Sequence, residues 1–173
     1  MKDNIYSQCK HVKLLVLDVD GTLTDGTVYY SANGEELKRF SIRDGMGIEL
    51  LRIAEITVAI ITSENSNIVR ARASKLKIEN VILGSRNKKK SLIELTEKLG
   101  VALEEVAYVG DDVNDIQALE IAGVSACPAD ANKYVKYVCD YICQSDGGKG
   151  AVREVVELIL LSQNKSITLP ENW

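Results

Sequence analysis

The chain has 173 residues, of which 46% are hydrophobic and 27% charged, and its formal net charge is -4. This composition is typical of a folded globular protein and excludes a disordered chain, and the length predicts a single domain over residues 1–173. The negative net charge argues against a nucleic-acid partner. No apolar stretch is long enough for a membrane span and no secretory leader is apparent, so we expect a cytoplasmic protein.

The first predicted element is a buried strand over residues 12–20, "VKLLVLDVD". Its apolar run gives way to two carboxylates, Asp18 and Asp20, that flank a single valine. A carboxylate beside apolar residues is unfavourable unless its charge is compensated. The end of this strand is therefore a candidate site.

The next segment, residues 26–40, reads as two extended runs around the turn "SANGE" and predicts a β-hairpin. Its apolar residues are numerous for an exposed hairpin. They pack either on the same domain or on a partner surface. They are Val28, Tyr29, Tyr30, Leu37 and Phe40.

Beyond the hairpin, helical and strand patterns alternate. Helices are predicted over 43–55, 66–77, 89–100, 111–123 and 149–163, and buried strands over 56–64 and 105–112, with shorter apolar runs at 124–128 and 139–144. Such alternation predicts an α/β fold with a doubly wound parallel sheet.

Polar residues gather where the three main strands end, which is where open parallel sheets bind ligands. Several acids in one crevice repel one another, and a divalent cation would remove this repulsion. An all-oxygen set without His or Cys favours Mg²⁺. These residues are Asp18, Asp20, Thr62, Ser63, Glu64, Asp111, Asp112, Asn114 and Asp115.

A calcium-binding EF-hand loop does not explain the first strand end, because Thr22, Leu23 and Tyr29 occupy places where that motif needs an acid or amide, a glycine and a glutamate. A magnesium site with a spare aspartate instead suits phosphoryl transfer. One carboxylate can attack phosphorus and another can transfer protons. Thr62 can supply a hydroxyl and a lysine of residues 87–90 a positive charge to the phosphoryl oxygens.

The segments "DVDGTLTDG", "AIIT", a lysine after "LGSRN", and "GDDVND" resemble, in order and spacing, the four motifs of the haloacid dehalogenase-like phosphatases. The hairpin and the tail "DYICQSDGGKGAVREVVELIL" further resemble the capless family of 3-deoxy-D-manno-octulosonate 8-phosphate phosphatases. That likeness covers roughly residues 12–161. It implies a homotetramer assembled through the hairpin, in which a neighbour's Gly-rich tail helps to close the active site.

The resemblance also implies roles for the acids. Asp18 matches the nucleophile and a metal ligand, and Asp20 the acid/base residue, whose backbone carbonyl also binds the metal. Asp111 matches the remaining carboxylate ligand of Mg²⁺. Asp115 matches a supporting position, with Asp112 and Asn114 beside it.

For the substrate, the resemblance assigns phosphate binding to Thr62 and Lys88, with Lys89 as the alternative lysine. Arg43 and Asp44 match the "RDG" that lines the substrate side. The implied activity is hydrolysis of 3-deoxy-D-manno-octulosonate 8-phosphate through an aspartyl-phosphate.

One segment departs from this pattern. The octulosonate enzymes often continue the second motif as "TGR", where this chain has "TSEN". Glu64, followed by Arg72 and Lys75, is more similar to phosphatases of nine-carbon 2-keto-3-deoxy sugar acid 9-phosphates. These acids, of the deaminated neuraminate or N-acetylneuraminate type, are the alternative substrates.

Signalling receiver domains also carry strand-end aspartates, a threonine and a lysine around Mg²⁺. In those proteins the phosphorylated aspartate lies mid-chain, whereas here the mid-chain strand ends in Thr62, so the order argues against a receiver. A catalytically inactive subunit is disfavoured because no expected residue is missing.

The remaining reactive residues do not form a recognisable site. The four cysteines show no zinc-like spacing and are expected to be free thiols, and a surface role is expected for His11. "GGKGA", residues 147–151, is either a flexible turn before a helix or a tail that closes the substrate site.

Overall fold

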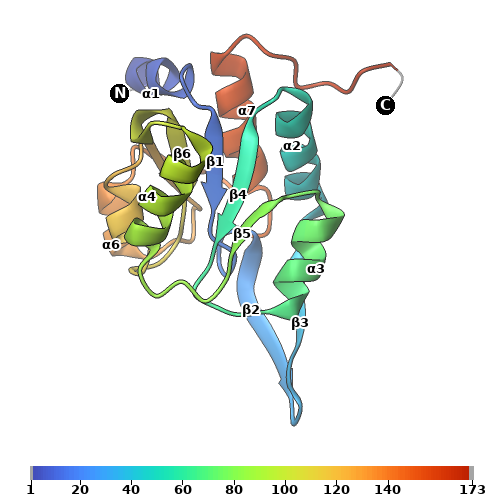
Figure 1. Ribbon diagram of the computed structural model, residues 1–173. Helices are drawn as coiled ribbons and strands as arrows, with labels where there is room; N and C mark the ends of the chain where they lie inside the picture. Colours follow the sequence, from blue (N-terminus) through green and yellow to red (C-terminus); the bar gives the residue numbers. More distant parts are fainter. Residues whose placement is uncertain (1, 172–173) are drawn as a thin grey trace.

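The structure is a computed structural model that describes residues 2–171 (Figure 1). Within them, six strands form one parallel sheet in the order β5-β4-β1-β6-β7-β8. The strands are β1 (Leu14–Leu17), β4 (Thr57–Ile61), β5 (Asn80–Ile82), β6 (Val106–Val109), β7 (Val124–Cys127) and β8 (Tyr141–Ile142). The prediction of a doubly wound parallel sheet is confirmed.

Helices cover both faces of this sheet (Figure 1). One apolar core packs α1, α2, α3 and α7 on one face, and a second core packs α4, α5 and α6 on the other. The helices are α1 (Lys2–Cys9), α2 (Ile42–Ile53), α3 (Asn67–Lys75), α4 (Lys88–Leu99), α5 (Ile116–Leu119), α6 (Lys133–Val138) and α7 (Ala151–Ser162), with a 3-10 turn η1 (Leu103–Glu105).

The central strand shows why its sequence is apolar without alternation. Leu15 and Leu17 of β1 belong to one core, and Leu14 and Val16 belong to the other. All four side chains are fully buried. Because successive side chains of a strand point to opposite faces, a strand covered on both faces needs an apolar residue at every position.

The predicted hairpin is confirmed as an antiparallel pair, β2 (Thr24–Ser31) and β3 (Gly34–Phe40), which projects from the sheet beyond the carboxyl end of β1 (Figure 1). Gly34 follows the turn with a φ of 110°, a conformation that side chains disfavour. Tyr29, Tyr30 and Leu37 are exposed by 58%, 71% and 61%, so three of the hairpin's apolar side chains are not covered by this protomer.

The structure corrects the helix predicted over 111–123, which is reduced to the four residues of α5. Asp111 and Asp112 stay in a loop because their backbone N–H groups donate to the Asp115 carboxylate at 3.2 and 3.3 Å. Local side-chain bonds of this kind compete with helix formation. The elements α1, β5 and α6 were not predicted.

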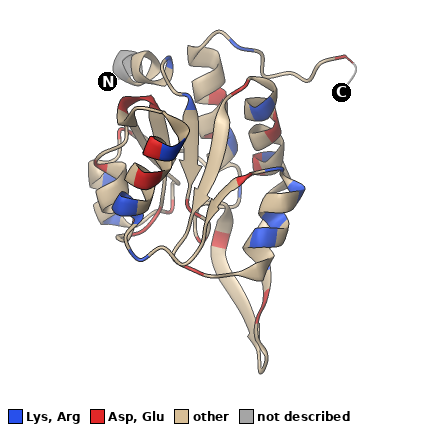
Figure 2. Ribbon diagram, in the orientation of Figure 1, with Lys and Arg blue, Asp and Glu red and all other residues tan. Residues whose placement is uncertain are grey.

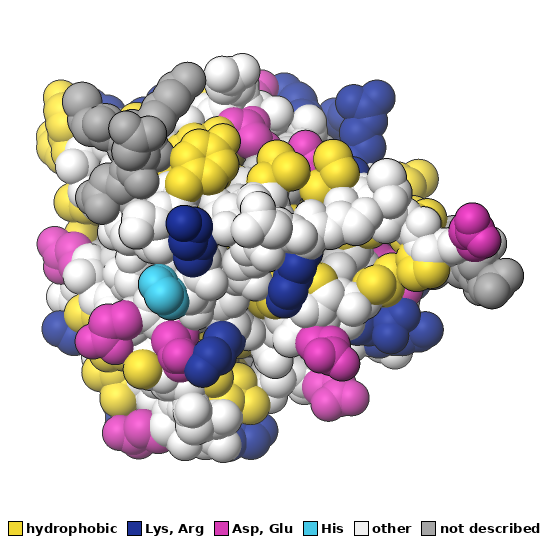
Figure 3. Space-filling model, turned by 90° about the horizontal axis from the view of Figure 1, so that it is seen from above, with side chains coloured by type: hydrophobic (Ala, Val, Ile, Leu, Met, Phe, Trp, Pro, Cys, Tyr) yellow, Lys and Arg dark blue, Asp and Glu magenta, His cyan; other side chains and the backbone are white. Residues whose placement is uncertain are grey.

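The remaining expectations concern the surface and the thiols. His11 precedes β1 and is exposed, and it is visible on the face seen from above in Figure 3. Cys9, Cys127, Cys139 and Cys143 are free, as predicted. None of the helices among residues 2–171 combines the length and the apolar character that crossing a membrane requires.

Candidate active site

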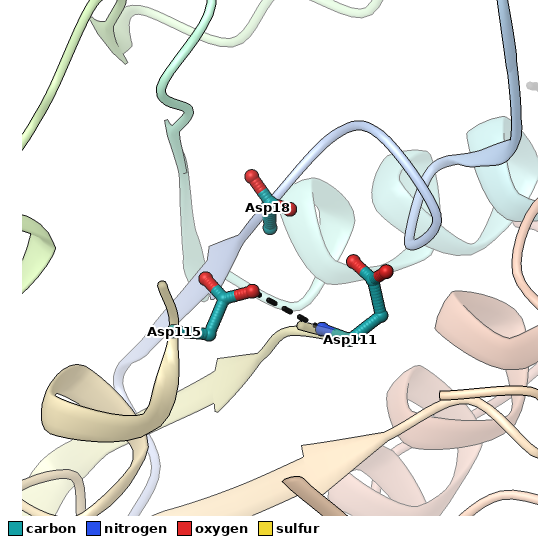
Figure 4. A group of neighbouring side chains, drawn as sticks. All are labelled: Asp18, Asp111 and Asp115. Carbon is teal, nitrogen blue, oxygen red and sulfur yellow. Dashed lines mark hydrogen bonds between the residues drawn. The ribbon is translucent and has the colours of Figure 1, made fainter. Parts of the chain in front are cut away.

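Three aspartates meet at the carboxyl end of the sheet (Figure 4). Asp18 follows β1, and its backbone N–H extends the ladder to Val109 of β6 at 3.0 Å. Asp111 lies in the loop after β6, and Asp115 immediately precedes α5. One carboxylate oxygen from each lies within 4.8 Å of the others, the only such group of potential metal ligands among the described residues.

Lys88 is the cation of this cluster. The side chain of Asn87 caps α4 by accepting from the Lys90 N–H at 2.9 Å, which makes Lys88 the first helical residue. The Lys88 ammonium lies 2.7 Å from Asp18 Oδ1 and 2.7 Å from Asp115 Oδ1. Lys89 is exposed, so the structure brings Lys88 and not the alternative lysine to the carboxylates.

Asp115 is fully buried and uses both of its oxygens. Oδ1 accepts from Lys88 and from the Tyr108 hydroxyl, at 2.7 and 2.9 Å, and Oδ2 accepts from the N–H groups of Asp111 and Asp112. Because each carboxylate oxygen has two lone pairs, these four bonds occupy the group. Asp18 and Asp111 are thus better placed to bind a cation, and Asp115 to support them.

Burial and mutual repulsion shift the acids toward their protonated forms when no cation is bound. Burial, followed by the charge of Asp115, raises the pKa of Asp18 well above its ordinary value, although Lys88 opposes this shift. Burial and Asp115 also raise the pKa of Asp111, to about 7. Three carboxylates against one ammonium leave two negative charges if all are ionised, which a divalent cation would balance.

The loop between β1 and β2 packs closely against Asp111. Thr22 donates its hydroxyl to Asp111 Oδ1 at 3.2 Å. A β-carbon at Gly21 would lie 2.1 Å from Asp111 Oδ2, which requires glycine there. Asp20 lies at the start of this loop and is not a member of the group of three aspartates. Instead Asp20 Oδ1 accepts from the Lys38 ammonium of β3 at 2.5 Å.

Residues after β4 and β6 form the rim of the cluster. Thr62 is buried at the end of β4, where its hydroxyl accepts from the Glu64 N–H at 3.4 Å. Asn114 donates to the Ser63 hydroxyl at 3.1 Å and so links the two strand ends. Asp112 is exposed and accepts from the Asn132 side chain, and Glu64 is also exposed.

The two "RDG" residues lie at the start of α2. Asp44 is 1% exposed, and its Oδ1 accepts from the Arg153 N–H of α7 at 2.8 Å, so its carboxylate caps a helix in this protomer. Arg43 is exposed and lines a shallow hollow with Arg39 and Lys149. The structure does not bring Arg43 or Asp44 into the aspartate cluster, and their substrate contacts stay a prediction.

Sequence reasoning missed three polar contacts of the site, those of Thr22, Tyr108 and Lys38. Thr22 lies inside the first motif and could have been considered. Tyr108 lies in a strand that reads as purely apolar, and Lys38 lies in a hairpin whose outward residues are charged. Nothing in the local pattern distinguishes either from an ordinary strand residue, because their partners are remote in sequence.

Comparison with known proteins agrees with this geometry. The pattern of the haloacid dehalogenase-like hydrolases matches residues 49–155. The 3-deoxy-D-manno-octulosonate 8-phosphate phosphatase KdsC of Escherichia coli strain K12 is 44% identical over 162 residues, which cover 94% of this chain and 86% of that protein.

Solved structures give the same result. The Moraxella catarrhalis 3-deoxy-D-manno-octulosonate 8-phosphate phosphatase, in complex with magnesium, phosphate and KDO, has a TM-score of 0.92 and 43% identity, with 95% of this chain and 94% of that chain covered. The cobalt-bound phosphatase of Haemophilus influenzae has a TM-score of 0.90 and 42% identity, with 92% and 93% covered.

The motifs, the parallel sheet with its strand-end aspartates, and these similarities together show that the chain belongs to the haloacid dehalogenase-like hydrolases and, within them, to the family of the 3-deoxy-D-manno-octulosonate 8-phosphate phosphatases.

Proposed function

We propose that this protein is a Mg²⁺-dependent phosphomonoesterase that hydrolyses 3-deoxy-D-manno-octulosonate 8-phosphate, a step in lipopolysaccharide precursor synthesis. The observation that carries the proposal is the cluster of Asp18, Asp111 and Lys88, of which Asp18 and Lys88 are buried, in a chain 44% identical to an enzyme named for this reaction. A carboxylate held beside an ammonium and a second acid suits nucleophilic phosphoryl transfer.

In the proposed reaction an oxygen of Asp18 attacks phosphorus while the bond from phosphorus to the sugar oxygen breaks. Asp20 gives the departing alkoxide a proton and later takes one from the water that attacks the aspartyl-phosphate. This second step releases phosphate and regenerates Asp18. Thr62 and Lys88 bind the oxygens of the phosphoryl group.

The residues present fit a magnesium ion. Asp18 and Asp111 would hold it together with the backbone carbonyl of Asp20, and Asp115, Asp112 and Asn114 would support the loop. When bound, Mg²⁺ supplies positive charge that stabilises the phosphoryl oxygens in the transition state.

A nine-carbon 2-keto-3-deoxy sugar acid 9-phosphate is the second candidate substrate. Glu64 supports it, because this exposed acid replaces a residue that is often basic at the corresponding place of the octulosonate enzymes. The helix that follows, α3, carries Arg70, Arg72 and Lys75, and Figure 2 shows the basic colouring of this helix. These cations could offset the acid and bind a sugar carboxylate.

The exposed apolar side chains of the hairpin support assembly, since contiguous apolar surface marks interaction sites. We expect a homotetramer in which the segment after β8 of one protomer closes the site of its neighbour. The four free cysteines are in keeping with a cytoplasmic location.

The test is phosphate release with Mg²⁺ from the eight-carbon 8-phosphate, the two nine-carbon 9-phosphates and an aryl phosphate, with Asp18→Asn as the blank. Preference for the eight-carbon ester supports the proposal. Preference for a nine-carbon ester would support the same phosphomonoesterase reaction with the second candidate substrate. A stable phosphoprotein without turnover would instead indicate a receiver-like function, and no reaction with any ester would overturn the proposal.

A further inference from the structure

Lys38 is buried although it lies in the projecting hairpin. Its side chain is 1% exposed, and its ammonium lies 2.5 Å from Asp20 Oδ1 and 2.9 Å from Glu35 Oε1. Lysine is rarely buried unless it is paired. The two carboxylates share the positive charge, and they fix the ammonium from two directions.

The second carboxylate oxygen of Asp20 differs from the first in its hydrogen bonding. Oδ2 is buried and has no hydrogen-bond partner among the described residues. A buried acceptor without a donor costs free energy, and a hydrogen bond from a bound molecule would remove that cost. Lys38 therefore occupies one oxygen of Asp20 and leaves the other without a donor.

Glu35 anchors this arrangement to the body of the protein. It accepts a hydrogen bond from the hydroxyl of Ser66, which also caps α3 through the Val69 N–H at 3.4 Å. Asp20, Lys38, Glu35 and Ser66 thus form one connected chain from the end of β1, through β3, to the first turn of α3. Charge-assisted bonds of this kind are strong and directional.

From these contacts we infer that Lys38 is a positioning residue for Asp20: it holds Oδ1 and so orients Oδ2 toward the leaving oxygen of the substrate. The inference rests on the proposed function, in which Asp20 protonates that oxygen. Lys38 itself takes no part in the chemistry. The hairpin consequently contributes to catalysis within its own protomer as well as to assembly.

If Lys38 positions Asp20, the rate loss on removing Lys38 should depend on the leaving group. A sugar alkoxide needs a proton to depart, whereas 4-nitrophenolate departs without one. In Lys38→Met we expect kcat/KM, which covers only the steps up to release of the alcohol and not hydrolysis of the aspartyl-phosphate, to fall by about 10² to 10³ for the sugar phosphate. For 4-nitrophenyl phosphate we expect kcat/KM to fall by only about threefold, and the larger loss lies within the range of general acid catalysis. KM should change little, and Lys38→Arg should recover part of the loss.

Two further comparisons separate positioning from general damage. Lys90→Met, which removes an exposed lysine, is the matched control. In an Asp20→Asn background, Lys38→Met should have no additional effect on kcat/KM for the sugar phosphate, because the residue it positions is already gone. Equal loss of kcat/KM with both esters, or an independent effect in the Asp20→Asn background, would overturn the inference.

Crystal structures of the wild type and of Lys38→Met give a readout that does not depend on turnover. We expect the Asp20 carboxylate to rotate in the variant, and an unchanged carboxylate would contradict the inference. If Lys38→Met fails to fold, Lys38→Gln, which keeps a donor, takes its place. If the wild type hydrolyses neither ester, the proposed function fails, and the two crystal structures still decide whether Lys38 positions Asp20.

Discussion

At the scale of single residues, the site depends on one lysine that bonds two carboxylates. Burial alone would lower the pKa of Lys88, but the charges of Asp18 and Asp115 raise it, so the ammonium remains charged in the core. The same ammonium holds the side chain of Asp18 in place. Lys88 thereby fixes the proposed nucleophile without occupying all of its oxygen lone pairs.

The first prediction concerns that nucleophile. Asp18→Asn should lower phosphate release by about 10³-fold or more, because an amide cannot form the aspartyl-phosphate. Glu97→Gln, which removes an exposed acid from α4, is the matched control and should retain activity. Near-normal turnover by Asp18→Asn would rule out the covalent mechanism.

A second prediction follows from the raised pKa of Asp111, which is about 7 in the folded protein without a cation because of burial and Asp115. In the unfolded chain this pKa is about 3.9. The unfolded state therefore binds fewer protons between these values, and the free energy of unfolding should fall as pH rises through about 4 to 7. Each unit of pKa difference is worth about 1.4 kcal/mol, so we expect a loss of a few kcal/mol.

Urea unfolding in EDTA at several pH values measures this loss. Saturating Mg²⁺ should remove most of the pH dependence, because the cation balances the ionised carboxylates. The variant Asp111→Asn should show a weaker dependence without the metal. An identical pH profile in EDTA and in Mg²⁺ would contradict the proposed site.

At the scale of elements, the segment before α7 is packed rather than loose. The Gly147 N–H donates to Asp130 at 2.9 Å, and the Gly148 N–H donates to the Thr22 carbonyl at 3.0 Å. Glu154 of α7 accepts from the backbone N–H of Gln144 at 2.9 Å. This Gly-rich segment therefore supports the loop after Asp20 in its own protomer, whatever it contributes to a neighbour.

This packing predicts that Gly147→Ala is damaging. The added β-carbon would lie 1.8 Å from the carbonyl oxygen of Gly21, so the loop must move. We expect a stability loss of about 1 to 3 kcal/mol, as for overpacked sites, together with a lower kcat, because the displaced loop follows Asp20.

The control is Gly100→Ala at the end of α4, where nothing lies within 4 Å of the added carbon and φ is 65°. Its left-handed conformation should cost about 1 to 2 kcal/mol without loss of activity. Urea unfolding and steady-state kinetics on both variants make the comparison. Equal activity of the two variants would mean that residue 147 does not support the catalytic loop.

At the scale of the whole molecule, the hairpin is the candidate assembly surface. If the proposed tetramer assembles through the hairpin, Tyr30→Glu and Leu37→Glu should shift it to smaller species in sedimentation equilibrium, because charge is costly in an apolar interface. Tyr137→Glu is the control, since Tyr137 is 82% exposed but lies on α6, outside the hairpin. A monomeric wild type would refute the tetramer.

The local features of this protein can be predicted from its amino-acid sequence. Each of the runs ending at Asp18, Thr62 and Asp111 is short and apolar without alternation, and that pattern predicts parallel strands with their polar ends at one edge. The hairpin follows from its turn residues, and the proposed site chemistry follows from the polar residues at the strand ends together with the resemblance of the four motifs. Each strand, turn and motif depends on neighbours within a few positions.

The pairing of side chains that are remote in sequence depends instead on the tertiary structure. The cap at Asn87 places Lys88, and not Lys89, beside the carboxylate of Asp18. Lys38 forms an ion pair with Asp20, and Asp44 accepts a hydrogen bond from the first turn of α7. Residues 111–115 form a loop around the Asp115 carboxylate. The reason is physical: periodicity reports which face of an element is buried, whereas a hydrogen bond between remote residues depends on where the other elements pack.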